Sequence, residues 1–150
     1  MNELKNKLYA YCEEYVTSRI TRIKKDIVET QRSANEETKS SAGDKYETGR
    51  AMAQLEIEKG TKQLAEIEKL QHQLSKIDPE KTTTTIQAGS LVHTDKAVFY
   101  FSISIGQVSL ESQPYFIVSL QSPIGAGFTG KKEGDQVRWN NVQYTITHIQ

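Results

Sequence analysis

The chain has 150 residues, with 36% apolar and 25% charged side chains, which suits a water-soluble protein of one domain or two small ones. Nineteen basic and nineteen acidic residues cancel, so the chain lacks the positive charge behind most DNA affinity, and sequence-specific DNA binding is not expected. No apolar run approaches the ~20 residues of a membrane span, and no signal peptide is recognisable. Cys12, the single cysteine, excludes an intrachain disulfide, so we expect a cytoplasmic protein.

The first predicted element is a helix from about residue 3 to 38. Its apolar side chains recur at spacings of three and four, which is the period of one helix face. They are Leu4, Leu8, Cys12, Tyr15 or Val16, Ile20, Ile23 and Ile27. At ~1.5 Å per residue such a helix is roughly 55 Å long, so it needs a partner along this face.

A second helix is predicted from about residue 44 to 77. Its stripe runs through Met52, Leu55, Lys59, Leu64 or Ala65, Ile67, Leu70, Leu74 and Ile77. Ser40, Ser41 and Gly43 separate the two helices by a short break. We therefore predict an antiparallel coiled-coil hairpin over residues 1–78, with its tip at about 36–47.

The chain changes character after Asp78-Pro79, because proline disfavours helix at the residue before it. Residues 79–85 read as a linker, and residues 86–150 as a small β domain with short strands rich in Val, Ile, Phe, Tyr and Thr. Asn140-Asn141 fits a two-residue hairpin turn. A short helix is expected after Ser122, ending near Gly130. The predicted class is α+β.

Residues 125–131 spell G-x-x-x-x-G-K, the pattern of phosphate-binding loops. Lys132 stands where that loop needs Ser or Thr for magnesium, and too little chain remains for its parallel sheet. Nucleotide hydrolysis is therefore not expected. His72, His93 and His148 have no metal-ligand spacing.

The stretch VSLQSPIGAGFTGKKEGDQV, preceded by a long helical hairpin, resembles the Gre family of bacterial transcription elongation factors. The matching residues are Ser122, Pro123, Ile124, Gly130, Lys131, Gly134 and Asp135. In the hairpin, Tyr46 and Arg50 match the family's Tyr-x-x-x-Arg.

This resemblance implies a factor with no active site and no cofactor of its own. The family's antiparallel β domain, similar in fold to FK506-binding proteins, docks on RNA polymerase at its secondary channel, and the coiled coil reaches through the channel. Acids at the tip then help to hold a shared magnesium ion and a water, and the polymerase cuts backtracked RNA. By this resemblance, the docking residues expected here are Ser122, Pro123, Ile124, Gly130, Lys131 and Asp135.

The tip departs from the family, since its two acidic positions fall on Lys39 and Ala42. Four acids remain nearby as candidates to assist the polymerase: Asp44, Glu47, Glu36 and Glu37. The chain is therefore expected either to stimulate cleavage through displaced acids or to occupy the channel without stimulating cleavage.

An alternative reading is a peptidyl-prolyl isomerase or chaperone resembling the FK506-binding proteins, with the hairpin as a dimerisation arm. It requires an apolar pocket lined by aromatic residues of the β domain, and the same residues also suit a packed core. The candidates are Phe99, Tyr115, Phe116, Trp139 and Tyr144.

Overall fold

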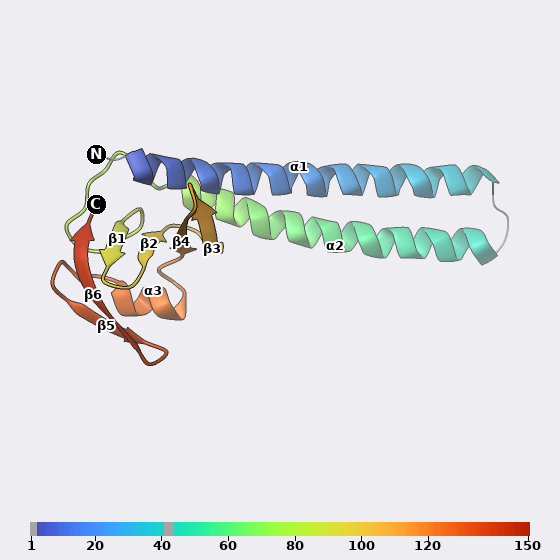
Figure 1. Ribbon diagram of the computed structural model, residues 1–150. Coiled ribbons are helices and arrows are strands. Elements are labelled where there is room, and N and C mark those ends of the chain that lie inside the picture. Colours follow the sequence, from blue (N-terminus) through green and yellow to red (C-terminus); the bar gives the residue numbers. More distant parts are fainter. Residues whose placement is uncertain (1–2, 41–43) are drawn as a thin grey trace. The chain divides into compact units, whose positions relative to one another are not determined.

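The computed structural model describes the backbone of residues 3–40 and 44–150, and the side chains of residues 3–36 and 48–150. Two long helices precede a six-stranded sheet with one short helix, which confirms the α+β class (Figure 1). The chain divides into a helical unit, residues 14–71, and a β unit, residues 1–13 with 72–150. The elements are α1 Glu3–Ser40, α2 Asp44–Ser75, β1 Leu91–Thr94, β2 Val98–Phe101, β3 Gly106–Leu110, β4 Gln113–Val118, α3 Pro123–Phe128, β5 Gln136–Trp139 and β6 Val142–Ile149.

In the helical unit, α1 and α2 run antiparallel, as the residues that line two hollows between them show. One hollow is lined by residues 23–30 of α1 and residues 56–63 of α2. The second hollow is lined by residues 26–34 of α1 and residues 49–56 of α2, so the chain advances in opposite directions along the two helices. The half-buried positions alternate at spacings of three and four, as along a coiled-coil seam. On α1 they include Ile20, Ile23, Ile27, Thr30 and Ala34, and on α2 Ala53, Ile57, Gly60, Leu64 and Ile67. Both helices agree with their predicted ranges to within a few residues.

The predicted stripe on α2 is wrong over its first part. Met52 and Leu55 are 63% and 65% exposed, and the seam uses smaller residues instead. A Cβ atom on Gly60 would lie 2.9 Å from Cγ1 of Ile27, so the glycine lets the two helices approach closely. Close packing therefore selects Ala53 and Gly60 over the larger apolar side chains beside them.

The β unit holds a sheet of order β3-β4-β2-β1-β6-β5. We predicted an antiparallel domain, but β2 and β4 pair in parallel, with Phe99 beside Phe116. The strand β3 was not predicted as a separate element. It is joined to β4 by Glu111 and Ser112, both with positive φ (52° and 64°), a turn usually signalled by Asn or Gly.

Of two further predictions for the β unit, the hairpin turn is correct and the start of the first strand is not. The predicted turn at Asn140-Asn141 is confirmed, with φ of 49° and 63°. The β domain predicted from residue 86 has its first strand, β1, only at Leu91. Ile86 instead exchanges backbone hydrogen bonds with Gly130 and Lys131. The segment before β1 is thus tied to the loop after α3.

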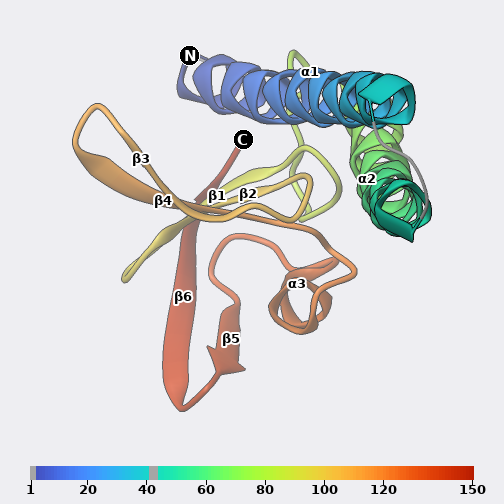
Figure 2. The same ribbon diagram turned by 90° about the vertical axis from the view of Figure 1, so that its right-hand side faces the viewer.

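The core of the β unit combines aliphatic residues with Phe99, Phe101 and Phe128. Phe128 comes from α3, the short helix beside the sheet in Figure 2. The ring of Phe128 lies 5.0 Å from that of Phe99 and 5.4 Å from that of Phe101. Tyr144 meets Phe99 edge-on at 5.4 Å. These contacts fix the short helix on the sheet, and with it the loop that follows.

The first turns of α1 belong to the β unit, where Leu8 and Cys12 are fully buried and several polar groups also make contacts. Lys5 is fully buried, its Nζ donates to the Lys81 carbonyl at 2.6 Å, and burial lowers its pKa. Lys7 pairs with Glu111 at 2.6 Å. The buried Cys12 thiol accepts a weak hydrogen bond from Ser102 at 3.8 Å, and burial raises its pKa to about 11.

The fully buried hydroxyl of Tyr100 has no hydrogen-bond partner within the described chain. Because an unpaired buried hydroxyl is destabilising, we expect Tyr100→Phe to raise the free energy of unfolding by about 1 kcal/mol. The fluorescence of Trp139, the only tryptophan, reports urea unfolding of the β unit. Tyr9→Phe, which removes the bond from Tyr9 to the Leu74 carbonyl, should instead lower stability, and equal effects of the two changes would contradict this account.

Candidate functional site

The stretch from Ser122 to Asp135 is built around a capped turn of helix. The Ser122 hydroxyl accepts from the Gly125 amide at 3.1 Å and donates to the Ser119 carbonyl at 2.6 Å. Pro123 follows at the first helical position, where its missing N–H costs nothing. The motif Ser-Pro-Ile is thus a helix start, as the sequence predicted.

Gly125 is required by packing. A Cβ atom at this position would lie 2.1 Å from the Ser119 carbonyl oxygen and 2.7 Å from Cα of Leu120. Its φ is not in the left-handed region, so space alone excludes a side chain. The helix therefore packs directly against the end of the strand segment that precedes it.

The loop after α3 is held by its own backbone and by one carboxylate. Gly130 adopts a φ of 77° and donates to the Ile86 carbonyl at 2.9 Å. Oδ2 of Asp135 accepts from the Lys132 amide at 3.0 Å. Asp135 is therefore engaged within its own turn.

The six predicted docking residues differ in their accessibility. Ser122 and Asp135 are half-buried and make the bonds described above, and Ile124 is half-buried against the aromatic core. Pro123, Gly130 and Lys131 are exposed. This stretch therefore offers its proline and its lysine to a partner, while the other residues shape it.

The G-x-x-x-x-G-K pattern at residues 125–131 does not form the structure of a phosphate-binding loop. Gly125 lies inside the six-residue α3, and Gly130 follows that helix instead of preceding a long one. The described residues contain no group of three or more His, Cys, Asp or Glu side chains placed to hold a metal ion. Neither observation favours a nucleotide or metal site.

His93 and His148 are cross-strand neighbours with ring centroids 6.0 Å apart. Nδ1 of His148 lies 3.1 Å from Oε1 of Glu133, which also accepts from the Ile149 amide. Burial, and secondarily His148, lower the pKa of His93. This pairing was not predicted from the sequence, because the two histidines are 55 positions apart along the chain.

The predicted tip acids fall mostly outside the described side chains. Glu36 is exposed, whereas Glu37, Asp44 and Glu47 lie outside that range. The helices reach Ser40 and resume at Asp44, so the predicted break is confirmed in position. The role of the acids stays a prediction.

The aromatic residues of the alternative reading mostly fill the core. Phe99 is fully buried, and Phe116 and Tyr144 pack against it with ring centroids 5.5 Å and 5.4 Å away. Tyr115 and Trp139 are half-buried on β4 and β5. Phe99, Phe116 and Tyr144 therefore form one group of packed rings in the core.

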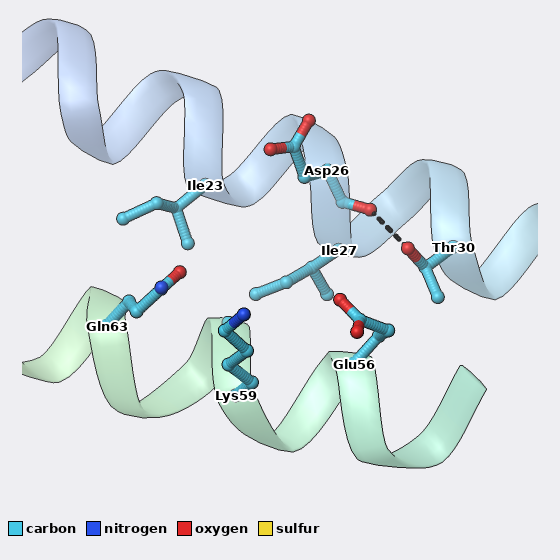
Figure 3. A pocket seen from close by; sticks show the side chains of 8 residues that line it. Ile23, Asp26, Ile27, Thr30, Glu56, Lys59 and Gln63 are labelled. Atoms are coloured by element: carbon cyan, nitrogen blue, oxygen red, sulfur yellow. Dashed lines mark hydrogen bonds between the residues drawn. The ribbon is translucent and has the colours of Figure 1, made fainter. Parts of the chain in front are cut away.

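The sequence did not predict a groove along one side of the helical pair. It consists of two adjoining hollows, of about 120 Å³ and about 430 Å³, that share Asp26, Thr30 and Glu56. Figure 3 shows the smaller hollow, with Ile23 and Ile27 pointing from α1 toward α2 and polar side chains around them. Its signal in the sequence is the small residues Gly49, Ala53 and Gly60 on α2.

Comparison with known proteins finds matches among solved structures. No family model matches the chain, and no curated protein matches it. Among the solved chains that match is the crystal structure of GreA factor homolog 1 (Gfh1) of Thermus thermophilus, at 15% identity and a TM-score of 0.36. The match covers 91% of this chain and 93% of that one. At that identity and TM-score, the residues and elements of this chain remain the basis for assigning a function.

The described helices include none that is both long and apolar enough to cross a membrane.

The two candidate surfaces belong to different units, the Ser122–Asp135 stretch to the β unit and the 36–47 segment to the helical unit. Each surface is therefore testable by its own substitutions.

Proposed function

We propose that this chain is a Gre-like transcription factor that binds bacterial RNA polymerase at its secondary channel. The β unit, as the counterpart of the family's FKBP-like domain, docks on the polymerase, and the paired helices enter the channel. The protein has no active site of its own. It acts in the cytoplasm by modulating elongation or the rescue of backtracked complexes.

One combination of features carries this proposal: an antiparallel pair of long helices in one chain with the capped Ser-Pro-Ile helix and its Gly-Lys and Gly-Asp loop. Helices of 38 and 32 residues exceed what a β unit of this size needs for its core. At a rise of ~1.5 Å per residue, such a pair of helices is long enough to extend into a channel. The exposed Pro123 and Lys131 give the β unit a surface for docking.

The chemistry at the tip decides between assisted cleavage and simple occupation of the channel. A carboxylate binds magnesium and stabilises an activated water, whereas an ammonium repels the ion and competes for the same carboxylates. Lys39 and Ala42 occupy the family's acidic positions, with Asp44 and Glu47 a few residues away. We therefore propose that the factor occupies the channel with little or no stimulation of cleavage.

The natural protein should bind RNA polymerase in a pull-down but stimulate RNA cleavage weakly or not at all in backtracked complexes. A Lys39→Asp, Ala42→Glu variant should gain cleavage, because it restores two magnesium-binding carboxylates. The measurement is the rate of shortening of labelled RNA with magnesium present.

An Asp44→Ala, Glu47→Ala variant is the control for the displaced acids and should match the natural protein. Strong cleavage by the natural protein that this variant abolishes would show that displaced acids suffice. No binding of the natural protein to polymerase would reject the proposed function itself.

A further inference from the structure

A charged stripe runs along one face of α1, beside the seam with α2. Arg19, Arg22, Asp26 and Glu29 follow one another at spacings of three, four and three, so they lie on one side of the helix. That side is the grooved one, because Asp26 and Glu29 both line the groove. The stripe is basic at one end and acidic at the other.

The same face of α2 carries a matching stripe. Glu56, Lys59 and Gln63 line the groove (Figure 3). Glu66 lies seven residues beyond Lys59, which places it on the same side of the helix. Its central residue is Gln63, near the midpoint between Lys59 and Glu66. This stripe too has opposite charges on either side of its centre.

The charges on this face are not paired with one another in the part of the chain whose side chains are described. Among the residues whose side chains are described, none of these basic and acidic groups forms an ion pair. Arg22 and Asp26 are four residues apart on one helix and still do not pair. Arg19 is held over the ring of Tyr15, with its Cζ 3.9 Å from the ring centroid, which orients it along the stripe.

The stripe of α1 complements an antiparallel copy of itself. The midpoint between Arg22 and Asp26 is also the midpoint between Arg19 and Glu29, so a two-fold axis there sets each arginine opposite an acid of the second copy. A parallel copy would set like charges together. Self-complementarity of this kind is what an isologous interface requires.

The stripe of α2 has its centre at the same level. Ile27 packs on Gly60 across the seam, so in an antiparallel pair Lys24, three residues earlier on α1, lies level with Gln63. One axis through that level therefore relates Arg22 to Asp26, Arg19 to Glu29, and Lys59 to Glu66 of the second copy. Two stripes on separate helices thus agree on one arrangement.

We propose that a second copy of this chain docks on the grooved face of the helical unit, with the two helical pairs packed antiparallel about this axis. The small residues Gly49, Ala53 and Gly60 are among those that line the groove, and small residues allow helices to approach closely. The partner is identified by its charge pattern, which is the chain's own. The proposal does not rest on the function proposed above.

The test uses sedimentation velocity of the full-length chain and charge-swapped variants. Dimers should form in about 0.05 M salt, and the dissociation constant should rise roughly tenfold in about 0.5 M salt, because salt screens exposed charges. The acidic variant Arg19→Glu, Arg22→Glu and the basic variant Asp26→Lys, Glu29→Lys should each be monomeric alone. Mixed in equal amounts they should associate, because every opposed pair is then complementary.

Matched controls carry the same charge changes on other faces of the helices: Lys24→Glu, Arg32→Glu and Glu58→Lys, Glu68→Lys. These should dimerise like the natural protein. A natural protein that is monomeric in low salt at every concentration would overturn the proposal, as would controls that lose association equally. Failure of the mixed variants to associate, with both shown to be helical by circular dichroism, would also overturn it.

Discussion

Gly125→Ala is expected to unfold or strongly destabilise the β unit. The added Cβ would meet the Ser119 carbonyl oxygen at 2.1 Å and Cα of Leu120 at 2.7 Å, which are backbone atoms that no rotamer change can move aside. Relief requires α3 to shift away from the sheet that it packs on. We expect a loss of about 3 kcal/mol or more, the upper end of overpacking costs.

Gly127→Ala is the matched control two residues along the same helix. Its Cβ would lie 3.4 Å from Cγ1 of Val137, an ordinary van der Waals distance. Alanine also has the higher helix propensity, worth about 0.5 to 1 kcal/mol. This variant should therefore be as stable as the natural protein or slightly more so.

Urea unfolding followed by Trp139 fluorescence compares the two variants within the β unit. The natural protein and Gly127→Ala should unfold at similar urea concentrations, and Gly125→Ala at a much lower one. Equal midpoints for the two alanine variants would show that α3 is free to shift. The polymerase binding proposed above should also be lost in Gly125→Ala, because the Ser122–Asp135 stretch then loses its fold.

The elements that the sequence predicted well depend on local chemistry. The start of α3 follows from the Ser122 cap and Pro123, and the turn at Asn140-Asn141 follows from residues that tolerate positive φ. The two long helices follow from spacing alone. In each case the deciding interactions lie within a few residues along the chain.

The elements that were missed depend on distant partners. The parallel pairing of β2 with β4 joins strands separated by another strand and two loops, so no local signal reports it. Glu111 and Ser112 adopt positive φ although neither residue usually signals such a turn. The α2 seam was misplaced because packing against Ile27 favoured Gly60 over larger neighbours.

In the candidate site, too, the features set by nearby residues were predictable and those set by distant packing were not. The shape of the Ser122–Asp135 stretch was predictable, because its caps and turns are closed by its own backbone and side chains. The sequence did not predict which residues of this stretch are exposed and which are half-buried. Their burial depends on how the stretch packs on the core of the β unit. The groove beside Gly60 was missed because it arises from two helices packed together.

Phe128→Ala should destabilise the β unit by about 3 to 5 kcal/mol, the usual cost of removing a buried aromatic ring. Phe128 is fully buried and meets the rings of Phe99, Phe101 and Tyr144. Its loss leaves a cavity and removes the main contact that holds α3 on the sheet.

Phe128→Leu and Ile124→Ala separate that cavity from a general weakening of α3. The leucine fills much of the space, so its cost should be clearly smaller than that of alanine. Ile124 is only half-buried, so removing its side chain should cost less than removing Phe128. In urea unfolding followed by Trp139 fluorescence, Phe128→Ala should therefore have the lowest midpoint concentration of the three variants. A midpoint for Ile124→Ala as low as that for Phe128→Ala would show that the edge of α3, and not its buried ring, anchors the Ser122–Asp135 stretch.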